Sequence, residues 1–404
     1  MRRRFGVAVI AGSFAVPIHA QTFGQDVAFL EKHTTVVVLG DEAGGARVAV
    51  CPDLQGRVMT SGPRGESGPS FGWIHRELLA SGLRDPHINA YGGEDRFWLG
   101  PEGGQYALFF AKGDPFDLAH WHTPAAIDTE PYPVANRTPD RVAFRKRMAP
   151  VNYAGFRFEV DLERTVRLVP ASEAWSGLGV AALPGVEVVA FESDNRITNA
   201  GTAAWRKETG LVSIWILGMF NPSPETVVVV PFEPGPEESL GPVVNDAYFG
   251  EVPSDRLLVR DGVIFFRGDG RHRSKIGVPP PRARPVLGSY DPRAAVLTLV
   301  QFDRVPGARD YVNSMWEIQQ EPFGGDVVNS YNDGPAAPGA KPLGPFYELE
   351  TSSPGAALDP RRSLAHRHRT LHLVGDRRSL DSVARSVLGV SLDEVVAAFG
   401  PPRN

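Results

Sequence analysis

Two carboxylates and two imidazoles lie near the C-terminal end of the sequence, and each pair is spaced by two residues. Glu348 and Glu350 occur in FYELETSSP, and His366 and His368 follow in HRHRT. Because alternate side chains of a β-strand point to one face, each pair is expected to face one way. If the two strands are neighbours, carboxylates and imidazoles share a cleft, which is the arrangement that acid–base catalysis requires. Glu350, His366 and His368 are therefore the catalytic candidates, and Glu348 beside them is an expected substrate-binding residue.

The same pattern has two other interpretations. Imidazoles at spacing two beside a glutamate can converge on one divalent metal ion, so a metal site remains an alternative, although no motif requires a cofactor. The residues also fit a solvated sheet face on which polar side chains are simply hydrogen-bonded. A further oxygen-rich segment, a predicted loop that carries Asp326, Asn329, Asn332 and Asp333, has oxygen ligands for calcium but lacks the spacing of an EF-hand.

A second group of polar and aromatic residues lies in GGEDRFWLGPEGGQ, which contains Glu94, Arg96, Trp98 and Glu102. An indole ring next to charged hydrogen-bonding groups suits a sugar, because the C–H faces of sugars stack on aromatic rings while their hydroxyls need directional partners. The glycines do not have the spacing of a dinucleotide-binding motif. We expect these residues to bind substrate.

A third group lies in YVNSMWEIQQ, where alternation predicts a strand over 312–319. The face with Trp316 and Ile318 is expected in the core. The opposite face carries Asn313 and Glu317, which we add to the expected substrate-binding residues.

The elements that must position these groups are mostly strands. The 43 glycines and 36 prolines divide the chain into short segments in which apolar residues alternate or form runs rich in Val, Ile and Phe. This pattern favours an all-β antiparallel sandwich. Predicted strands are 35–39, 46–51, 106–110, 156–162, 186–192, 212–217, 226–231, 262–267, 296–302 and 312–319. Helices are expected only at 73–81 and in a C-terminal tail, 379–399, with Ser379 and Ser391 as N-caps that start two short helices packed on the sandwich.

Composition limits the classes of function. A net charge of −5 with scattered basic residues gives no nucleic-acid-binding patch. The single cysteine, Cys51, excludes an internal disulfide and is expected to be packed. Residues 1–20 have the basic start, short apolar run and small final residue of a signal peptide, and no later apolar run is long enough to span a membrane. We expect a periplasmic or secreted bacterial protein with one domain over 21–404. The sequence does not set its oligomeric state.

Taken together, several segments resemble the galactose mutarotase-like superfamily, and more closely a family of exported bacterial proteins of unassigned function within it. The resemblance rests on GGEDRFWLGPEGGQ, FNPSPETVVVVPF, VVNDAYFGEVP, YVNSMWEIQ, and FYELETSSPGAALDP with HRHRT. It implies a large antiparallel β-supersandwich with a carbohydrate site on a concave sheet face. It also implies that Glu350, in a Glu-Thr step before a proline-containing loop, is a general base. The histidine that aldose 1-epimerases carry after an Asn-containing strand is missing after 197–199.

We therefore expect a carbohydrate ligand and acid–base chemistry on a sugar or glycan fragment, either epimerisation or glycosidic cleavage. A histidine near Glu350, His366 or His368, is the expected acid. The alternative is a binding module that uses the same cleft without catalysis, and a third possibility is a purely structural sandwich.

Overall fold

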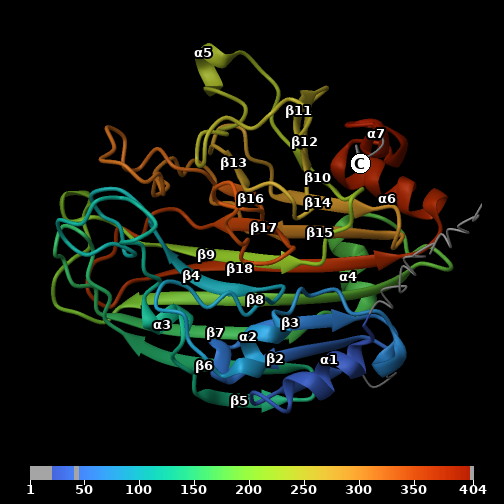
Figure 1. The fold of residues 1–404 in the computed structure, drawn as a ribbon, viewed down its shortest axis with the longest axis horizontal. Coiled ribbons are helices and arrows are strands. Elements are labelled where there is room, and N and C mark those ends of the chain that lie inside the picture. The colour runs from blue at the N-terminus through green and yellow to red at the C-terminus, as the bar shows by residue number, and fades with distance from the viewer. Residues whose placement is uncertain (1–20, 41–44, 401–404) are drawn as a thin grey trace, which may run out of the picture.

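The computed structural model describes residues 21–40 and 45–400, so the expected signal peptide, residues 1–20, lies outside the described part of the chain. Figure 1 shows long strands stacked in layers, with α6 and α7 beside one end of the sheets and α1 at the bottom. The predicted antiparallel sandwich is confirmed, because every strand pair is antiparallel.

The strands are β1 (Val37–Gly40), β2 (Arg47–Cys51), β3 (Arg57–Gly62), β4 (Arg96–Gly100), β5 (Val134–Thr138), β6 (Arg141–Met148), β7 (Val160–Leu168), β8 (Glu187–Asn199), β9 (Ser213–Phe220), β10 (Val227–Pro231), β11 (Leu257–Arg260), β12 (Val263–Arg267), β13 (Ser274–Val278), β14 (Val286–Asp291), β15 (Val296–Phe302), β16 (Val328–Asn332), β17 (Tyr347–Ser352) and β18 (Ser363–Val374). The α-helices are α1 (Phe23–Leu30), α2 (Arg76–Ser81), α3 (Ala125–Asp128), α4 (Ala171–Leu178), α5 (Glu237–Leu240), α6 (Arg377–Leu388) and α7 (Leu392–Ala397).

Two layers make up the sandwich. One layer is a ten-stranded sheet in the order β11-β12-β10-β14-β15-β18-β8-β7-β6-β5. The other layer consists of a five-stranded sheet, β13-β16-β17-β9-β4, and a three-stranded sheet, β1-β2-β3. An isolated bridge between Val58 of β3 and Asp95, the residue before β4, joins these two sheets. Apolar side chains of both layers pack in shared clusters, for example Val50 and Ile216 with Phe144 and Leu162, so the main core lies between the layers.

The C-terminal helices cover the outer face of the ten-stranded sheet. Leu380 and Leu388 of α6 pack in one cluster with Val229 and Leu299 of the sheet, as expected for a tail that packs on the sandwich. Ser391 caps α7 in a capping box with Glu394, which confirms that prediction.

The start of α6 differs from the prediction. Its N-cap is Asp376 and not Ser379, because the Asp376 carboxylate accepts hydrogen bonds from the amides of Arg378 and Ser379.

Two predicted strands are wrong. Residues 106–110 form an irregular segment whose side chains from Ala107 to Phe110 are all buried. Residues 312–319 also form no strand, because the Gln319 amide donates to the carbonyls of Asn313 and Met315 and holds the segment in a compact loop. Ile318, expected in the core, is 64% exposed.

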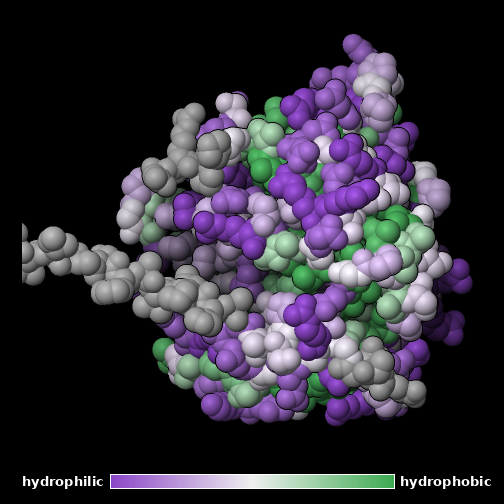
Figure 2. Space-filling view, turned by 90° about the vertical axis from the view of Figure 1, so that its right-hand side faces the viewer, coloured by the Kyte–Doolittle hydropathy of each residue, from purple (hydrophilic) through white to green (hydrophobic). Residues whose placement is uncertain are grey.

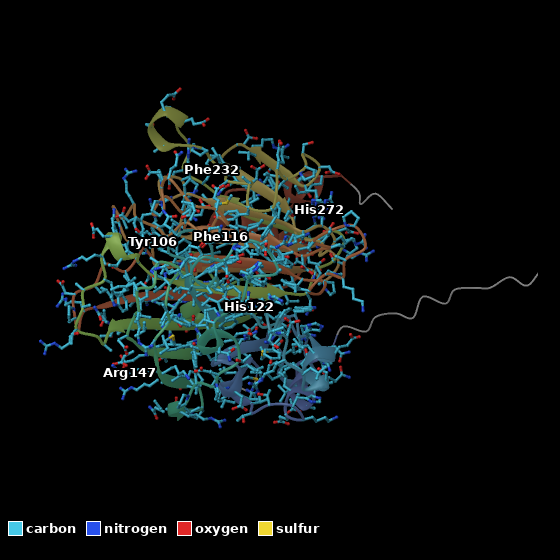
Figure 3. All side chains as sticks on the ribbon, turned by 60° about the vertical axis from the view of Figure 1, so that its left-hand side comes forward. Tyr106, Phe116, His122, Arg147, Phe232 and His272 are labelled. Atoms are coloured by element: carbon cyan, nitrogen blue, oxygen red, sulfur yellow. The ribbon has the colours of Figure 1, made fainter. Side chains whose placement is uncertain are left out.

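The uncovered half of the ten-stranded sheet carries charged side chains. In Arg147 of β6, Nη1 lies 3.8 Å from Oδ1 of Asp161 and Nη2 lies 3.7 Å from Oε2 of Glu159. Figure 3 labels Arg147 near the rim of the molecule. Figure 2 shows hydrophilic residues spread across one face of the molecule, with hydrophobic residues in smaller areas between them. Within the described residues, no helix is long and apolar enough to cross a membrane.

Candidate functional site

The outward face of the five-stranded sheet is set by the register of its strands. Glu348 of β17 pairs with Met219 of β9 on one side and with Tyr331 of β16 on the other. Tyr331 in turn pairs with Lys275 of β13. Because paired residues share a face, these side chains form one row across the sheet. A second row, through Arg96 of β4, Leu217 and Glu350, runs beside it.

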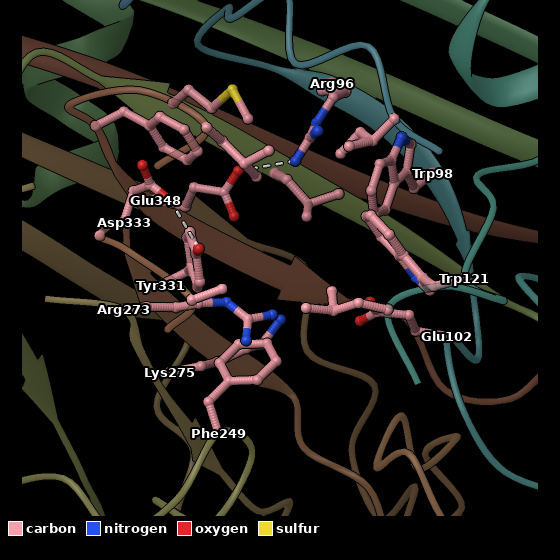
Figure 4. Close-up of a pocket in the computed structure, with 18 of the residues that line it drawn as sticks. Arg96, Trp98, Glu102, Trp121, Phe249, Arg273, Lys275, Tyr331, Asp333 and Glu348 are labelled. Atoms are coloured by element: carbon pink, nitrogen blue, oxygen red, sulfur yellow. Dashed lines mark hydrogen bonds and ion pairs between the residues drawn. The ribbon is translucent and has the colours of Figure 1, made fainter. Parts of the chain in front are cut away.

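A cavity of about 250 Å³ lies over this face, with loops forming its other walls (Figure 4). Its lining residues are Ile88, Arg96, Trp98, Glu102, Leu118, Trp121, Trp215, Leu217, Met219, Phe249, Arg273, Lys275, Trp316, Tyr331, Asp333, Gly334, Ala336, Lys341, Leu343, Phe346 and Glu348. A concave site of this kind, apolar with a few polar groups, is typical of small-molecule binding.

Aromatic rings form much of the cavity wall. The Trp98 ring lies edge-on to Trp215, with centroids 5.5 Å apart, and Trp121 lies 5.7 Å from Trp316. Phe249 stands edge-on to Trp316 at 6.4 Å. Mutual packing fixes these rings before a ligand arrives, so they offer preformed flat surfaces to an apolar ligand face.

Glu348 is the carboxylate at the centre of this face. Its Oε1 accepts a hydrogen bond of 2.8 Å from Nη2 of Arg96, and both side chains are almost fully buried. Burial raises the pKa of Glu348, Arg96 opposes that rise, and the neighbouring Glu350 adds to it. The raised pKa enlarges the protonated fraction of Glu348 near neutral pH, which a proton donor needs.

Glu350 lies on the same face of β17 but deeper, and it is fully buried. Its Oε2 accepts hydrogen bonds from Nζ of Lys275 at 3.0 Å and from the indole of Trp215 at 2.9 Å. Its Oε1 is buried without a hydrogen-bond partner in the described protein. Glu350 thus supports two lining residues from behind and is not itself among the residues that line the cavity.

Two further carboxylates line the cavity. Figure 4 shows Glu102 across the pocket from Glu348 and Asp333. Burial raises the pKa of Glu102. Asp333 accepts hydrogen bonds from the Tyr331 hydroxyl and the Gly344 amide, and burial raises its pKa to about 6. The site therefore contains carboxyl groups in different environments on opposite walls.

The two candidate histidines do not reach this cavity. His366 and His368 belong to β18 of the ten-stranded sheet, and both contact the Thr351 hydroxyl, at 2.8 and 2.9 Å. Thr351 follows Glu350 in β17, so it points to the opposite face, into the space between the layers. Burial lowers the pKa of His366 to about 3 and that of His368 to about 4. The expected cleft shared by carboxylates and imidazoles is thus not formed, because β17 lies between them.

The predicted substrate-binding residues fall into two sets. Arg96, Trp98, Glu102 and Glu348 line the cavity together, and their role in binding substrate stays a prediction. Glu94 instead lies in the interior, where its carboxylate accepts hydrogen bonds from Ser61 and contacts Nε2 of His372 at 2.8 Å.

Asn313 and Glu317 are also outside the cavity lining. The sequence predicted that both residues lie on one face of a strand, but the segment 312–319 forms a loop. Asn313 hydrogen-bonds the backbone of this loop, and Glu317 is exposed to solvent.

Several lining residues were missed by the sequence analysis. Trp215 and Leu217 fall in a predicted strand, but nearly every residue there is apolar, so no face could be chosen. Tyr331 and Lys275 lie on β16 and β13, two short strands without a strong apolar pattern. The charged residues of HRSK at 272–275 were the one local signal that could have identified β13 as part of a site.

No metal centre is found in the described part of the chain, where no group of three or more His, Cys, Asp and Glu side chains could hold an ion. The calcium alternative assumed that Asn329 and Asn332 lie in a loop, but both belong to strand β16, residues 328–332. Asp326 accepts a hydrogen bond of 2.6 Å from the Tyr248 hydroxyl, while Asp333 bonds Tyr331. Cys51 is fully buried, as expected.

Comparison with protein families gives one result. The model of a family described as "Family of unknown function (DUF6786)" matches residues 21–399. The chain belongs to the DUF6786 family. A comparison of this DUF6786 member with curated protein sequences finds no match.

Solved structures share the fold. The Slr1438 protein from Synechocystis sp. PCC 6803 is 15% identical, with a TM-score of 0.51 over 85% of this chain and 96% of its own. A galactose mutarotase-like protein from Lactobacillus casei is 10% identical, with a TM-score of 0.47 over 84% of this chain and 100% of its own. A putative aldose 1-epimerase from Escherichia coli K12 is 12% identical, with a TM-score of 0.46 over 85% and 100%. At 15% identity, the match with Slr1438 concerns the fold alone.

Proposed function

We propose that this DUF6786 protein binds a sugar or glycan fragment in the cavity and acts on it by acid–base chemistry. The observation that carries the proposal is a carboxyl group with a raised pKa, Glu348, inside a cavity walled by preformed indole rings. Indole faces suit the C–H faces of a sugar ring, and the charged groups between them suit its hydroxyls.

In this proposal Glu348 donates a proton to a ring oxygen or leaving-group oxygen. Glu102, on the opposite wall, accepts a proton from the sugar or from a water molecule (Figure 4). Arg96 orients Glu348 through their hydrogen bond. Epimerisation and glycosidic cleavage both need one donor and one acceptor on opposite sides of the reacting carbon, so both reactions belong to the proposal.

The alternative of a binding module without catalysis has one observation in its favour. No histidine of the described residues lines the cavity, so the imidazole acid that the sequence predicted is missing there. The catalytic roles first predicted for Glu350, His366 and His368 remain predictions.

We also propose that the protein works in the periplasm or as a secreted protein. The support is the order of a basic start, a short apolar run and a small final residue within residues 1–20. Its test is N-terminal sequencing of the protein recovered from periplasmic and culture fractions, where a start at or near Gln21 is expected.

The catalytic proposal is tested by a proton NMR time course with free sugars, glycosides and oligosaccharides. The variants are Glu348→Gln and Glu102→Gln, and the matched control is Glu317→Gln, which removes an exposed carboxylate outside the cavity. We expect faster anomeric exchange or a new reducing end with the wild type and the control. The Glu348→Gln variant should lose it by about a hundredfold or more. Ligand line-broadening without chemistry in any protein would leave only the binding module.

A further inference from the structure

Cationic side chains are concentrated along the cavity. Arg96, Arg273, Lys275 and Lys341 all line it, against the three carboxyl groups of Glu102, Asp333 and Glu348. Two of these cations already have carboxylate partners. Arg96 donates to Glu348 at 2.8 Å, and Lys275 donates to Glu350 at 3.0 Å.

Arg273 is different, because it has an aromatic support but no carboxylate partner. Its guanidinium lies over the Phe249 ring, 3.7 Å from the centroid, which fixes the plane of the group. Within residues 21–40 and 45–400, no hydrogen bond or ion pair holds its guanidinium nitrogens. Arg273 is close enough to Glu102 and Asp333 to lower the pKa of each, but neither carboxylate lies within the 4.0 Å of an ion pair.

Lys341 adds a second free charge at the exposed rim of the same cavity, and among the described residues it too has no ion-pair partner. The carboxyl groups offset these charges only in part. Glu348 is already paired with Arg96, and both oxygens of Asp333 accept hydrogen bonds, from Tyr331 and Gly344. A half-buried guanidinium with open N–H groups is suited to an oxyanion, which it can bind through two parallel hydrogen bonds.

We propose that the sugar bound in this cavity carries an anionic substituent, a carboxylate or a sulfate, which Arg273 binds with Lys341 at the rim. This inference rests on the proposed function, because it names the substrate class of the same site. Phe249 holds the guanidinium plane, so the anion is bound in one orientation and places the sugar ring against the indole walls.

The test compares matched ligands by isothermal titration calorimetry at low ionic strength. The ligands are methyl glycosides of glucuronate and galacturonate, the neutral glucoside and galactoside, and the 6-sulfated galactoside. The variants are Arg273→Gln and Lys341→Gln, and the matched control is Arg271→Gln, an exposed arginine two residues away that does not line the cavity. Thermal unfolding of each variant checks that it is folded.

We expect at least one anionic ligand to bind about tenfold or more tightly than its neutral parent. Arg273→Gln should abolish this preference, Lys341→Gln should reduce it by a smaller factor, and Arg271→Gln should leave it unchanged. Preference for uronates identifies the carboxylate as the substituent, and preference for the sulfated sugar identifies the sulfate. Equal affinity for anionic and neutral sugars would overturn the anion site while leaving the sugar-binding proposal intact. Absence of binding by every sugar, with all variants folded, would overturn both.

Discussion

The two faces of strand β17 place polar residues in different environments: one face packs against the other layer of the sandwich, and the other borders the cavity. On the inner face, between the layers, Thr351 is enclosed by His366 and His368 and contacts both. On the outer face Glu348 borders a cavity that has room for a ligand. The same residue types, carboxylates and basic groups, occur on both sides.

The inner polar groups are matched mainly to each other. Arg164 donates to Asp95 at 2.6 Å and to Asn195 at 2.6 Å, and both members of the ion pair are fully buried. Glu94 uses both carboxylate oxygens within the protein. In the cavity, by contrast, Arg273 has no such partner among residues 21–40 and 45–400. Most of these inner charged groups thus have partners within the protein, whereas the guanidinium of Arg273 is the group that we propose binds a ligand.

The largest expected effect tests the inner face. Arg164→Met leaves the Asp95 carboxylate buried without its partner, so the free energy of unfolding should fall by about 3–5 kcal/mol. Urea denaturation followed by circular dichroism measures it. The control is Arg145→Met, which removes a solvent-exposed pair with Glu163 and should change stability by less than about 1 kcal/mol. A loss of sugar affinity in folded Arg164→Met protein would contradict the assignment of Arg164 to the structural interior.

The second prediction tests the outer face. Glu348→Gln keeps the shape of the side chain but removes the proton donor, so turnover should fall by about a hundredfold or more while the protein stays folded. Sugar affinity should change much less than turnover. Steady-state rates and thermal unfolding of the same preparations separate the two. If the variant unfolds at a much lower temperature with unchanged turnover per folded molecule, Glu348 belongs with the inner, structural class.

The third prediction concerns pH. Burial lowers the pKa of His366 to about 3 and that of His368 to about 4, below the ordinary value of 6.5. Between pH 6.5 and about 4 the unfolded chain therefore binds protons that the folded chain does not, and stability falls as pH falls. Each histidine contributes a slope of up to about 1.4 kcal/mol per pH unit.

Urea denaturation between pH 4 and 7 tests this sign. The pH dependence of stability should be flatter in His368→Gln than in the wild type by about that slope, and unchanged in His33→Gln, which replaces an exposed histidine. Equal slopes in all three proteins would contradict a neutral, buried His368.

The smallest effect is expected outside both regions. Ser391→Ala removes the hydroxyl that accepts a hydrogen bond from the Glu394 amide at the start of α7, so the free energy of unfolding should fall by about 1 kcal/mol. Sugar affinity should not change. Differential scanning calorimetry and ligand titration check the two statements, and an altered affinity would mean that the C-terminal helices act on the cavity.

The sequence predicted the fold class because local alternation and apolar runs are sufficient for strands such as 296–302, which matches β15. It failed at 106–110 and 312–319, where apolar runs or alternation occur without a neighbouring strand to pair with. Pairing depends on segments far away in the chain, and a local pattern does not contain that information.

The site was predictable in part for the same reason. Arg96, Trp98 and Glu102, which line the cavity, could be grouped from the sequence because they lie within seven residues of each other. Arg273, Trp121 and Trp316 come from separate segments that only the folded chain brings together. The histidines were misplaced because alternation gives the face of a strand but not the sheet to which the strand belongs.

The alternation of β17 also has a consequence for insertions and deletions. A single residue inserted inside β17, directly before Glu348, would exchange the two faces, so that Thr351 would point to the cavity and the glutamates to the histidines. Under the proposed function, substitutions at 348 change ligand preference while the interior stays intact, whereas a one-residue length change in β17 damages both at once. Libraries designed to alter specificity should therefore keep the length of 347–352 fixed and vary length only in the preceding segment, 334–345.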